Sequence, residues 1–202
     1  INKEQNKLTR YEAIKTIKNY LQENDIIIST TGKTSRELYL INNKCKKKHS
    51  DLFVVGGMGH SSSIALGILN SSQKKRLFLL DGDGAMLMHL GILSLLGKQT
   101  NNTFVHILLN NKVHDSVGGQ STSISNVNLS LLSKSMKYKY YKLIKTKNSL
   151  QNYLKKIRFE KSSYFINLEI GAGSVKSLPR PIDHPSKNFE LFQKKINVVI
   201  SK

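Results

Sequence analysis

The sequence predicts a three-layer α/β/α fold built on a mainly parallel sheet of six strands. Short segments such as Asp25–Ser29 and Arg76–Leu80 contain continuous apolar runs, as expected of strands that are buried on both faces. Helical periodicity separates these runs, for example in Thr9–Asn24. Glycine and polar residues gather where strands pass into helices. Ligands bind at this carboxyl edge in such folds, so the functional site is expected there.

The expected strands and helices alternate along all 202 residues, which we assign to one domain, residues 1–202. In the first helix, Ala13, Ile14 and Ile17 recur at helical spacing. The expected strands are Asp25–Ser29, Asp51–Val55, Arg76–Leu80, Thr103–Leu109, Tyr138–Ile144 and Ser163–Ile170. The expected helices are Thr9–Asn24, Thr34–Leu40, Ser61–Leu69, Met86–Leu96, Leu129–Met136, Ser149–Ile157 and Lys187–Ile196.

The composition is that of a globular protein, with 39% hydrophobic residues and a formal net charge of +19. So strong a positive charge can indicate a nucleic-acid partner. The lysines are, however, spread along the chain without a basic helix interleaved with aromatic residues. We therefore expect no nucleic-acid partner, and a basic nucleic-acid-binding α/β domain stays a distant alternative. A positive field would still attract a small anionic substrate.

The single cysteine, Cys45, has no second thiol with which to form an internal disulfide or a CxxC metal site. The longest apolar runs are too short to cross a membrane, and the first residues do not resemble a signal peptide. These features favour a cytoplasmic protein without a membrane partner.

Four strand-to-helix junctions are rich in glycine and polar residues, and three familiar motifs match them incompletely. A P-loop would need a glycine where Ile27 stands, and the dinucleotide-like glycines around Met58 lack an acidic residue about twenty positions on. Asp81 follows a strand and resembles the nucleophile of haloacid-dehalogenase-type phosphatases. That alternative is disfavoured because no later pair of acidic residues is present to bind magnesium. The four junctions are Thr30–Glu37, Gly56–Ser61, Asp81–Ala85 and Asn110–Gln120.

One interpretation explains the junctions together as parts of a single binding site. Gly82-Asp83-Gly84, followed after 25 residues by Asn110-Asn111, resembles the motif that binds thiamine diphosphate through Mg²⁺. Mg²⁺ prefers octahedral oxygen ligands, which Asp83, Asn111 and the carbonyl of Val113 can supply. Gly84 and Ala85 fall where a helix begins, so we expect their free N–H groups to face the diphosphate.

The resemblance extends over most of the chain. The four stretches that carry it are similar to thiamine diphosphate-dependent decarboxylases of the phosphonopyruvate type, with the sulfopyruvate type as the near alternative. This implies decarboxylation of a small anionic 2-oxo acid, namely 3-phosphonopyruvate in phosphonate biosynthesis. The stretches are Thr30–Leu38, Gly57–Gly67, Gly82–Gly97 and Asn110–Gln120.

The resemblance also implies roles for individual residues. Gly32 and its neighbours Lys33 and Thr34 would contact the diphosphate. The carbonyl of Gly56 would accept a hydrogen bond from the aminopyrimidine. Met58 would be the apolar wedge that bends the cofactor, although a methionine there is also a plausible core residue.

Two histidines, His60 and His114, stand in the junctions nearest to the expected reactive carbon. A histidine there can transfer protons near neutral pH or, when charged, bind a phosphonate. A hydrogen-bonded loop histidine is the plain alternative for each.

The glutamate that promotes cofactor activation in this family lies on a separate pyrimidine-binding domain, and the sequence has no equivalent. We therefore expect that domain to be absent from this chain. Either an N-terminal domain has been cut away from the polypeptide, or a partner subunit supplies the missing domain. A homo-oligomer is expected, because the site in this family lies between the two kinds of domain and commonly across a subunit interface.

Overall fold

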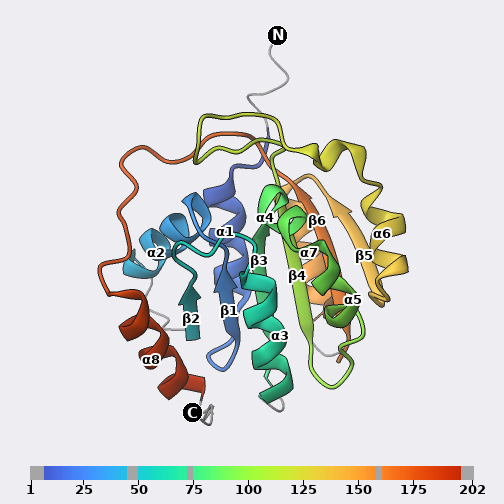
Figure 1. Ribbon diagram of the computed structural model, residues 1–202, viewed down its shortest axis with the longest axis horizontal. Coiled ribbons are helices and arrows are strands. Elements are labelled where there is room, and N and C mark those ends of the chain that lie inside the picture. Colours follow the sequence, from blue (N-terminus) through green and yellow to red (C-terminus); the bar gives the residue numbers. More distant parts are fainter. Residues whose placement is uncertain (1–6, 45–49, 72–74, 158–160, 197–202) are drawn as a thin grey trace.

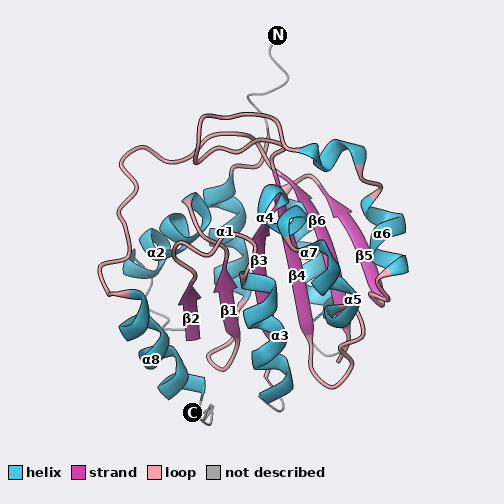
Figure 2. Ribbon diagram, viewed as in Figure 1, coloured by secondary structure: helices cyan, strands magenta, loops and turns pink. Residues whose placement is uncertain are grey.

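Six strands form one sheet in the order β2-β1-β3-β4-β6-β5, and every pairing between them is parallel (Figure 2). The computed structural model of the chain describes residues 7–44, 50–71, 75–157 and 161–196, so Cys45 lies outside the described residues (Figure 1). The strands are β1 (Ile26–Ser29), β2 (Ser50–Phe53), β3 (Leu77–Gly82), β4 (Phe104–Asn110), β5 (Tyr140–Ile144) and β6 (Ser163–Glu169). The expected fold class is confirmed.

Helices cover both faces of the sheet. One apolar cluster joins one face to α1, α2 and α7, and a second joins the other face to α3, α4, α5, α6 and α8. Residues alternate between the clusters along a strand, since Ile27 belongs to the first and Ile28 to the second. The helices are α1 (Arg10–Tyr20), α2 (Lys33–Lys44), α3 (Ser61–Ser71), α4 (Asp83–Met88), α5 (Leu93–Leu96), α6 (Leu129–Ser135), α7 (Lys147–Lys156) and α8 (Pro185–Ile196).

The expected single helix Met86–Leu96 is wrong. The chain instead forms α4, a 3₁₀ turn at Leu90–Ile92 and then α5. His89 ends α4 with a non-helical backbone, at φ −131° and ψ 47°, and Gly91 follows in the turn. Gly91, a poor helix former, is a local feature of this run that disfavours a continuous helix.

A segment without helix or strand, residues 171–184, runs from β6 across the carboxyl edge of the sheet to α8 at its far side (Figure 1). We call it the strap. Three side chains from the body of the fold anchor it. Asp115 accepts from the N–H of Gly173, and Glu37 accepts from the N–H of Val175. Arg36 donates to the carbonyl of Pro179 at 3.2 Å and also to that of Leu178.

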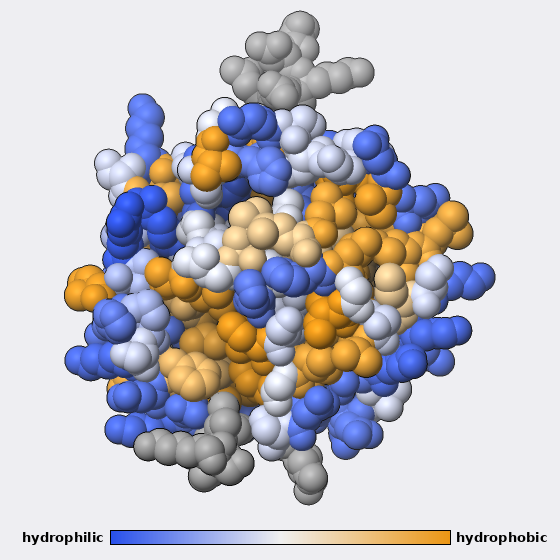
Figure 3. Space-filling view, viewed as in Figure 1, coloured by the Kyte–Doolittle hydropathy of each residue, from blue (hydrophilic) through white to orange (hydrophobic). Residues whose placement is uncertain are grey.

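Apolar side chains lie exposed on the face seen in Figure 3, over α3 to α5. Met88 is 56% exposed and Leu95 is 51% exposed. None of the described helices is both long and apolar enough to cross a membrane.

Candidate active site

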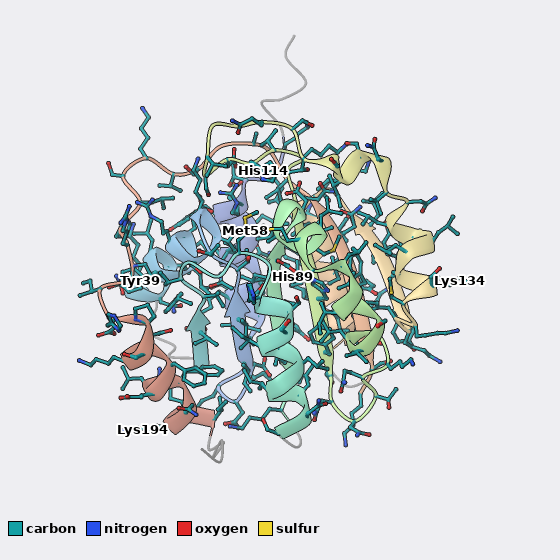
Figure 4. The ribbon with its side chains drawn as sticks, viewed as in Figure 1. Tyr39, Met58, His89, His114, Lys134 and Lys194 are labelled. Carbon is teal, nitrogen blue, oxygen red and sulfur yellow. The ribbon has the colours of Figure 1, made fainter. Side chains whose placement is uncertain are left out.

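A cavity of about 270 Å³ lies at the carboxyl edge of the sheet. The loops that follow β1, β3 and β4 form most of its wall, and Met58 from the loop after β2 completes it. Arg10, at the start of α1, also lines it. Figure 4 places Met58 and His114 close together at this edge. The glycine-rich junctions of the sequence therefore meet around one cavity, as parallel strands require.

Asp83 joins two of these junctions. Its side chain is buried, and Oδ1 accepts from the N–H of Gly84 at 2.8 Å. Oδ2 accepts from the N–H of Lys112 at 2.6 Å and from the hydroxyl of Thr122 at 3.2 Å. Burial raises the pKa of Asp83, and the hydrogen bonds partly oppose this rise. The Gly84 N–H is thus engaged by Asp83, whereas the sequence suggested that it is free.

Asn111 precedes the Lys112 that binds Asp83, and its side chain has a defined orientation. Its Nδ2 donates to Asp115 Oδ2 at 2.7 Å, and its Oδ1 accepts from the N–H of Val113 at 3.2 Å. Between them Lys112 has a positive φ of 65°, which curls the turn tightly. Asp83, Asn111 and Val113 all line the cavity and together carry one carboxylate, one amide oxygen and one backbone carbonyl.

Two glycines allow loops to approach each other across this cavity. A Cβ added at Gly84 would lie 2.4 Å from His114 Cε1, so the missing side chain lets the imidazole cover the start of α4. A Cβ at Gly32 would lie 2.8 Å from Ser116 Oγ, and the φ of Gly32 is +85°. The loops after β1, β3 and β4 are packed against one another at these two points.

The cavity brings together most of the predicted site residues and leaves two outside it. Gly56 is exposed, with a φ of +79° and its N–H donating to Thr31 Oγ1. His60 is also exposed and packs on His89, with 4.5 Å between the ring centroids. The predicted residues that do line the cavity are Gly32, Lys33, Thr34, Met58, Asp83, Gly84, Ala85, Asn111, Val113 and His114.

Sequence reasoning missed Arg10 and Asp115. Arg10 is 5% exposed and forms an ion pair with Asp115, and its Nη1 lies 3.9 Å from Glu37 Oε1. Burial raises the pKa of Glu37, while Arg10 acts in the opposite direction. A signal was present, because Arg10 has the helical spacing of the buried Ala13 and Ile14. A charged side chain on the buried face of a helix must have a partner inside.

Asp81 is not placed to act as a nucleophile. It is 0% exposed and lies beneath the site, where Oδ2 accepts from His106 Nε2 at 3.3 Å. Its Oδ1 accepts from the N–H of Gly82. A side chain that is fully buried and hydrogen-bonded at both oxygens does not fit the phosphatase alternative.

Residues 31–168 match the family model described as thiamine pyrophosphate enzyme, C-terminal TPP binding domain. The chain belongs to this family. The motif that unites Asp83 and Asn111 lies inside the matched segment, whereas Arg10 and the strap lie outside it.

Curated relatives of this TPP-binding domain include two kinds of decarboxylase. It is 31% identical over 179 residues to phosphonopyruvate decarboxylase of Streptomyces viridochromogenes, covering 89% of this chain and 44% of that protein. It is 36% identical over 127 residues to sulfopyruvate decarboxylase subunit beta of Methanococcus maripaludis, covering 63% of this chain and 65% of that protein. The chain therefore spans less than half the length of the first relative.

Solved structures share the fold of the TPP-binding domain at low sequence identity. A 2-oxoglutarate:ferredoxin oxidoreductase from Magnetococcus marinus has a TM-score of 0.66 at 13% identity, covering 87% of this chain and 69% of that chain. Benzoylformate decarboxylase from Polynucleobacter necessarius has a TM-score of 0.65 at 12% identity. The match covers 82% of this chain and 33% of that chain. At these identities the likeness extends to the fold alone.

Proposed function

We propose that this chain is the diphosphate-binding part of a thiamine diphosphate- and Mg²⁺-dependent decarboxylase that converts 3-phosphonopyruvate into phosphonoacetaldehyde and CO₂. The observation that carries the proposal is the meeting of Asp83, Asn111 and Val113 at one cavity. The phosphonopyruvate decarboxylase of S. viridochromogenes, which matches 89% of the chain, supports the choice of reaction.

The oxygens at the cavity fit a hard divalent cation that is bound together with a diphosphate. Asp83 supplies the charged oxygen, Asn111 an amide oxygen and Val113 its carbonyl. Mg²⁺ commonly takes only one or two carboxylates from the protein and its other ligands from phosphate and water. Of the two carboxylates among the described residues that line the cavity, Asp115 is paired with Arg10, which leaves Asp83 as the single carboxylate of such a set.

Two buried polar atoms at the cavity also fit an anion. Thr30 Oγ1 and Arg10 Nη1 have no hydrogen-bond partner among the described residues, and both residues line the cavity. An unsatisfied buried donor costs free energy, which a phosphate oxygen would recover. Lys33, also at the cavity, adds positive charge beside the same wall.

When bound, thiamine diphosphate supplies the electron sink that decarboxylation of a 2-oxo acid requires. The residues of this chain hold and orient it. Met58 gives the wall an apolar side chain. His114, which covers Gly84, is placed to hold or move a proton, or to bind the phosphonate of the substrate. Gly56 and His60 are exposed, so we assign their roles to the assembled enzyme, in which a second domain covers them.

That second domain is a pyrimidine-binding domain, carried either by the same polypeptide or by a partner subunit. The exposed apolar side chains Met88 and Leu95 support a covering partner on that face. The M. maripaludis relative is named as a beta subunit, which supports a separate subunit. A homo-oligomer of the assembled enzyme is part of the same proposal.

A sulfopyruvate decarboxylase subunit is the second candidate, favoured by the 36% identity to the M. maripaludis protein. The test is kcat/KM of the complete enzyme for phosphonopyruvate, sulfopyruvate and pyruvate. A phosphonate carries nearly twice the charge of a sulfonate and gains more from a cationic side chain. We expect phosphonopyruvate to be preferred and His114→Ala to reduce that preference about tenfold or more. A preference for sulfopyruvate would move the chain to the second candidate, and equal use of pyruvate would discard the anion-binding role.

A further inference from the structure

A continuous set of polar contacts links α1 and the strap to Asn111. Arg10 forms an ion pair with Asp115 Oδ2, and the same oxygen accepts from Asn111 Nδ2 at 2.7 Å. The N–H of Gly173 in the strap completes the set, at 3.1 Å from Asp115 Oδ1. Asp115 thus receives hydrogen bonds from three separate segments of the chain.

Asp115 and the N–H of Val113 together determine which way the amide of Asn111 points, because one binds its NH₂ end and the other its oxygen. An ionised carboxylate can only accept hydrogen bonds, so it must face the NH₂ end of an amide. With its NH₂ held by Asp115, Asn111 is forced to direct Oδ1 away from that carboxylate. The opposite rotation of the amide would place Oδ1 against Asp115 and present hydrogen atoms where a cation needs an oxygen.

Arg10 and the strap hold Asp115 in place for this task. Arg10 is 5% exposed and pairs with Asp115 inside the fold, which keeps a negative charge tolerable at that position. Both Arg10 and Gly173 lie outside the segment 31–168 that matches the family model. The N-terminal flank therefore contributes Arg10 to the wall of the cavity, and the C-terminal flank supports Asp115 through Gly173.

We propose that Asp115, held by Arg10 and Gly173, is a positioning residue that fixes the amide of Asn111 with its oxygen turned toward the Mg²⁺ site. The inference rests on the proposed function, because it assumes that Asn111 Oδ1 is a metal ligand. Residues that orient a metal ligand from behind commonly change metal affinity about tenfold to a hundredfold when they are replaced. Asp115 is expected to fall in that range.

A double-mutant cycle tests this role. The variants are Asp115→Asn, Asn111→Asp and the combination of the two. The combination, called the exchanged variant, swaps the amide and the carboxylate between the two positions without changing composition or charge. The measurement is the Mg²⁺ dissociation constant of the complete protein with saturating thiamine diphosphate, checked with Mn²⁺ by electron paramagnetic resonance. Thermal unfolding without cofactor reports folding separately.

Asp115→Asn alone should weaken Mg²⁺ binding about tenfold or more. A carboxylate at position 111 has two equivalent oxygens and needs no orientation, so the same change in the Asn111→Asp background should weaken binding by less than about twofold. An equal loss in both backgrounds, or no loss in the parent, would overturn the proposal. If Asp115→Asn does not fold, the exchanged variant decides alone. It should bind Mg²⁺ no more than about twofold more weakly than Asn111→Asp, and a larger loss would overturn the proposal.

Glu37→Gln is the matched control. Glu37 lies near the same arginine and accepts from the strap at Val175, but its hydrogen bonds and ion pairs within the described part of the chain do not include Asn111. Its effect on Mg²⁺ binding should therefore be the same in the parent and in the Asn111→Asp background. If the parent protein binds no Mg²⁺ with thiamine diphosphate, the proposed function itself fails. If the parent binds and the Asp115 cycle is additive, only the positioning role fails.

Discussion

The backbone N–H of Lys112 donates to Asp83 Oδ2 across 2.6 Å, and this bond joins the turn after β4 to the start of α4. The two residues follow neighbouring parallel strands, in which Gly82 pairs with Leu109. Lys112 makes this bond with its backbone at a positive φ of 65°. The carboxylate that we propose as a metal ligand and the Asn111 turn are therefore held together by a backbone that a lysine adopts at some cost.

The first prediction concerns this strained turn. Lys112→Gly should keep or raise the stability of the cofactor-free protein, because glycine adopts a positive φ without steric cost. Lys112→Val should destabilise it by about 1–3 kcal/mol, since a β-branched residue strongly disfavours this conformation. Urea unfolding of the three proteins measures the difference. Equal stability of the glycine and valine variants would show that the turn is not strained.

The second prediction concerns the close approach of His114 to Gly84. Gly84→Ala should weaken binding of thiamine diphosphate with Mg²⁺, because the new methyl group overlaps the imidazole and forces it from its place. The cofactor-free protein should lose about 1–3 kcal/mol of stability. In a His114→Gly background the same change should cost far less stability. A penalty of the same size in both backgrounds would mean that His114 is not what the added methyl group meets.

The strands and the glycine-rich junctions could be predicted because both are local signals. Apolar runs such as Arg76–Leu80 define buried strands, and parallel strands bring their carboxyl ends to one edge whatever their order. The placement of β6 between β4 and β5 depends on long-range packing and has no local signature. The expected helix Met86–Leu96 is interrupted at His89. The sequence carried one weak signal of this interruption, Gly91, inside a strongly apolar run.

The ion pair of Arg10 with Asp115 could not be predicted, because it joins residues 105 positions apart. The sequence indicated only that Arg10 shares a helical face with buried residues such as Ile14. The hydrogen bonds that anchor the strap could not be predicted for the same reason. Val175 and Gly173 bind side chains that precede them by more than 50 positions.

The third prediction follows from the raised pKa of Glu37. Burial raises this pKa, so folding disfavours the ionised carboxylate. The stability that the protonated group contributes is fully present below the unfolded-state value of about 4.3 and is lost as pH rises through the folded-state pKa. Glu37→Gln should therefore be more stable than the parent at about pH 7, and the advantage should shrink toward about pH 4.

Urea unfolding of the cofactor-free proteins at both pH values measures this difference. Glutamine can still accept from the N–H of Val175, so the strap contact is preserved. A parent that is more stable than Glu37→Gln at neutral pH would show that the pair with Arg10 outweighs the cost of burial.

The fourth prediction concerns the chain by itself. Purified residues 1–202 should release no CO₂ from phosphonopyruvate with thiamine diphosphate and Mg²⁺, because the family's activating glutamate is expected on another domain. Adding the pyrimidine-binding domain or subunit should restore turnover. Steady turnover by the isolated chain would disprove the proposal that a second domain completes the active site.

The most direct test of the account is calorimetric titration of thiamine diphosphate into the complete protein, with and without Mg²⁺. The parent should bind only with Mg²⁺. Asp83→Ala should lose at least about a hundredfold in affinity, because it removes the charged ligand of the proposed metal site. Asp183→Ala removes an equal charge from the strap, where the side chain is 46% exposed, and should bind like the parent. Binding by Asp83→Ala as tight as that of the parent would contradict the assignment of the cavity.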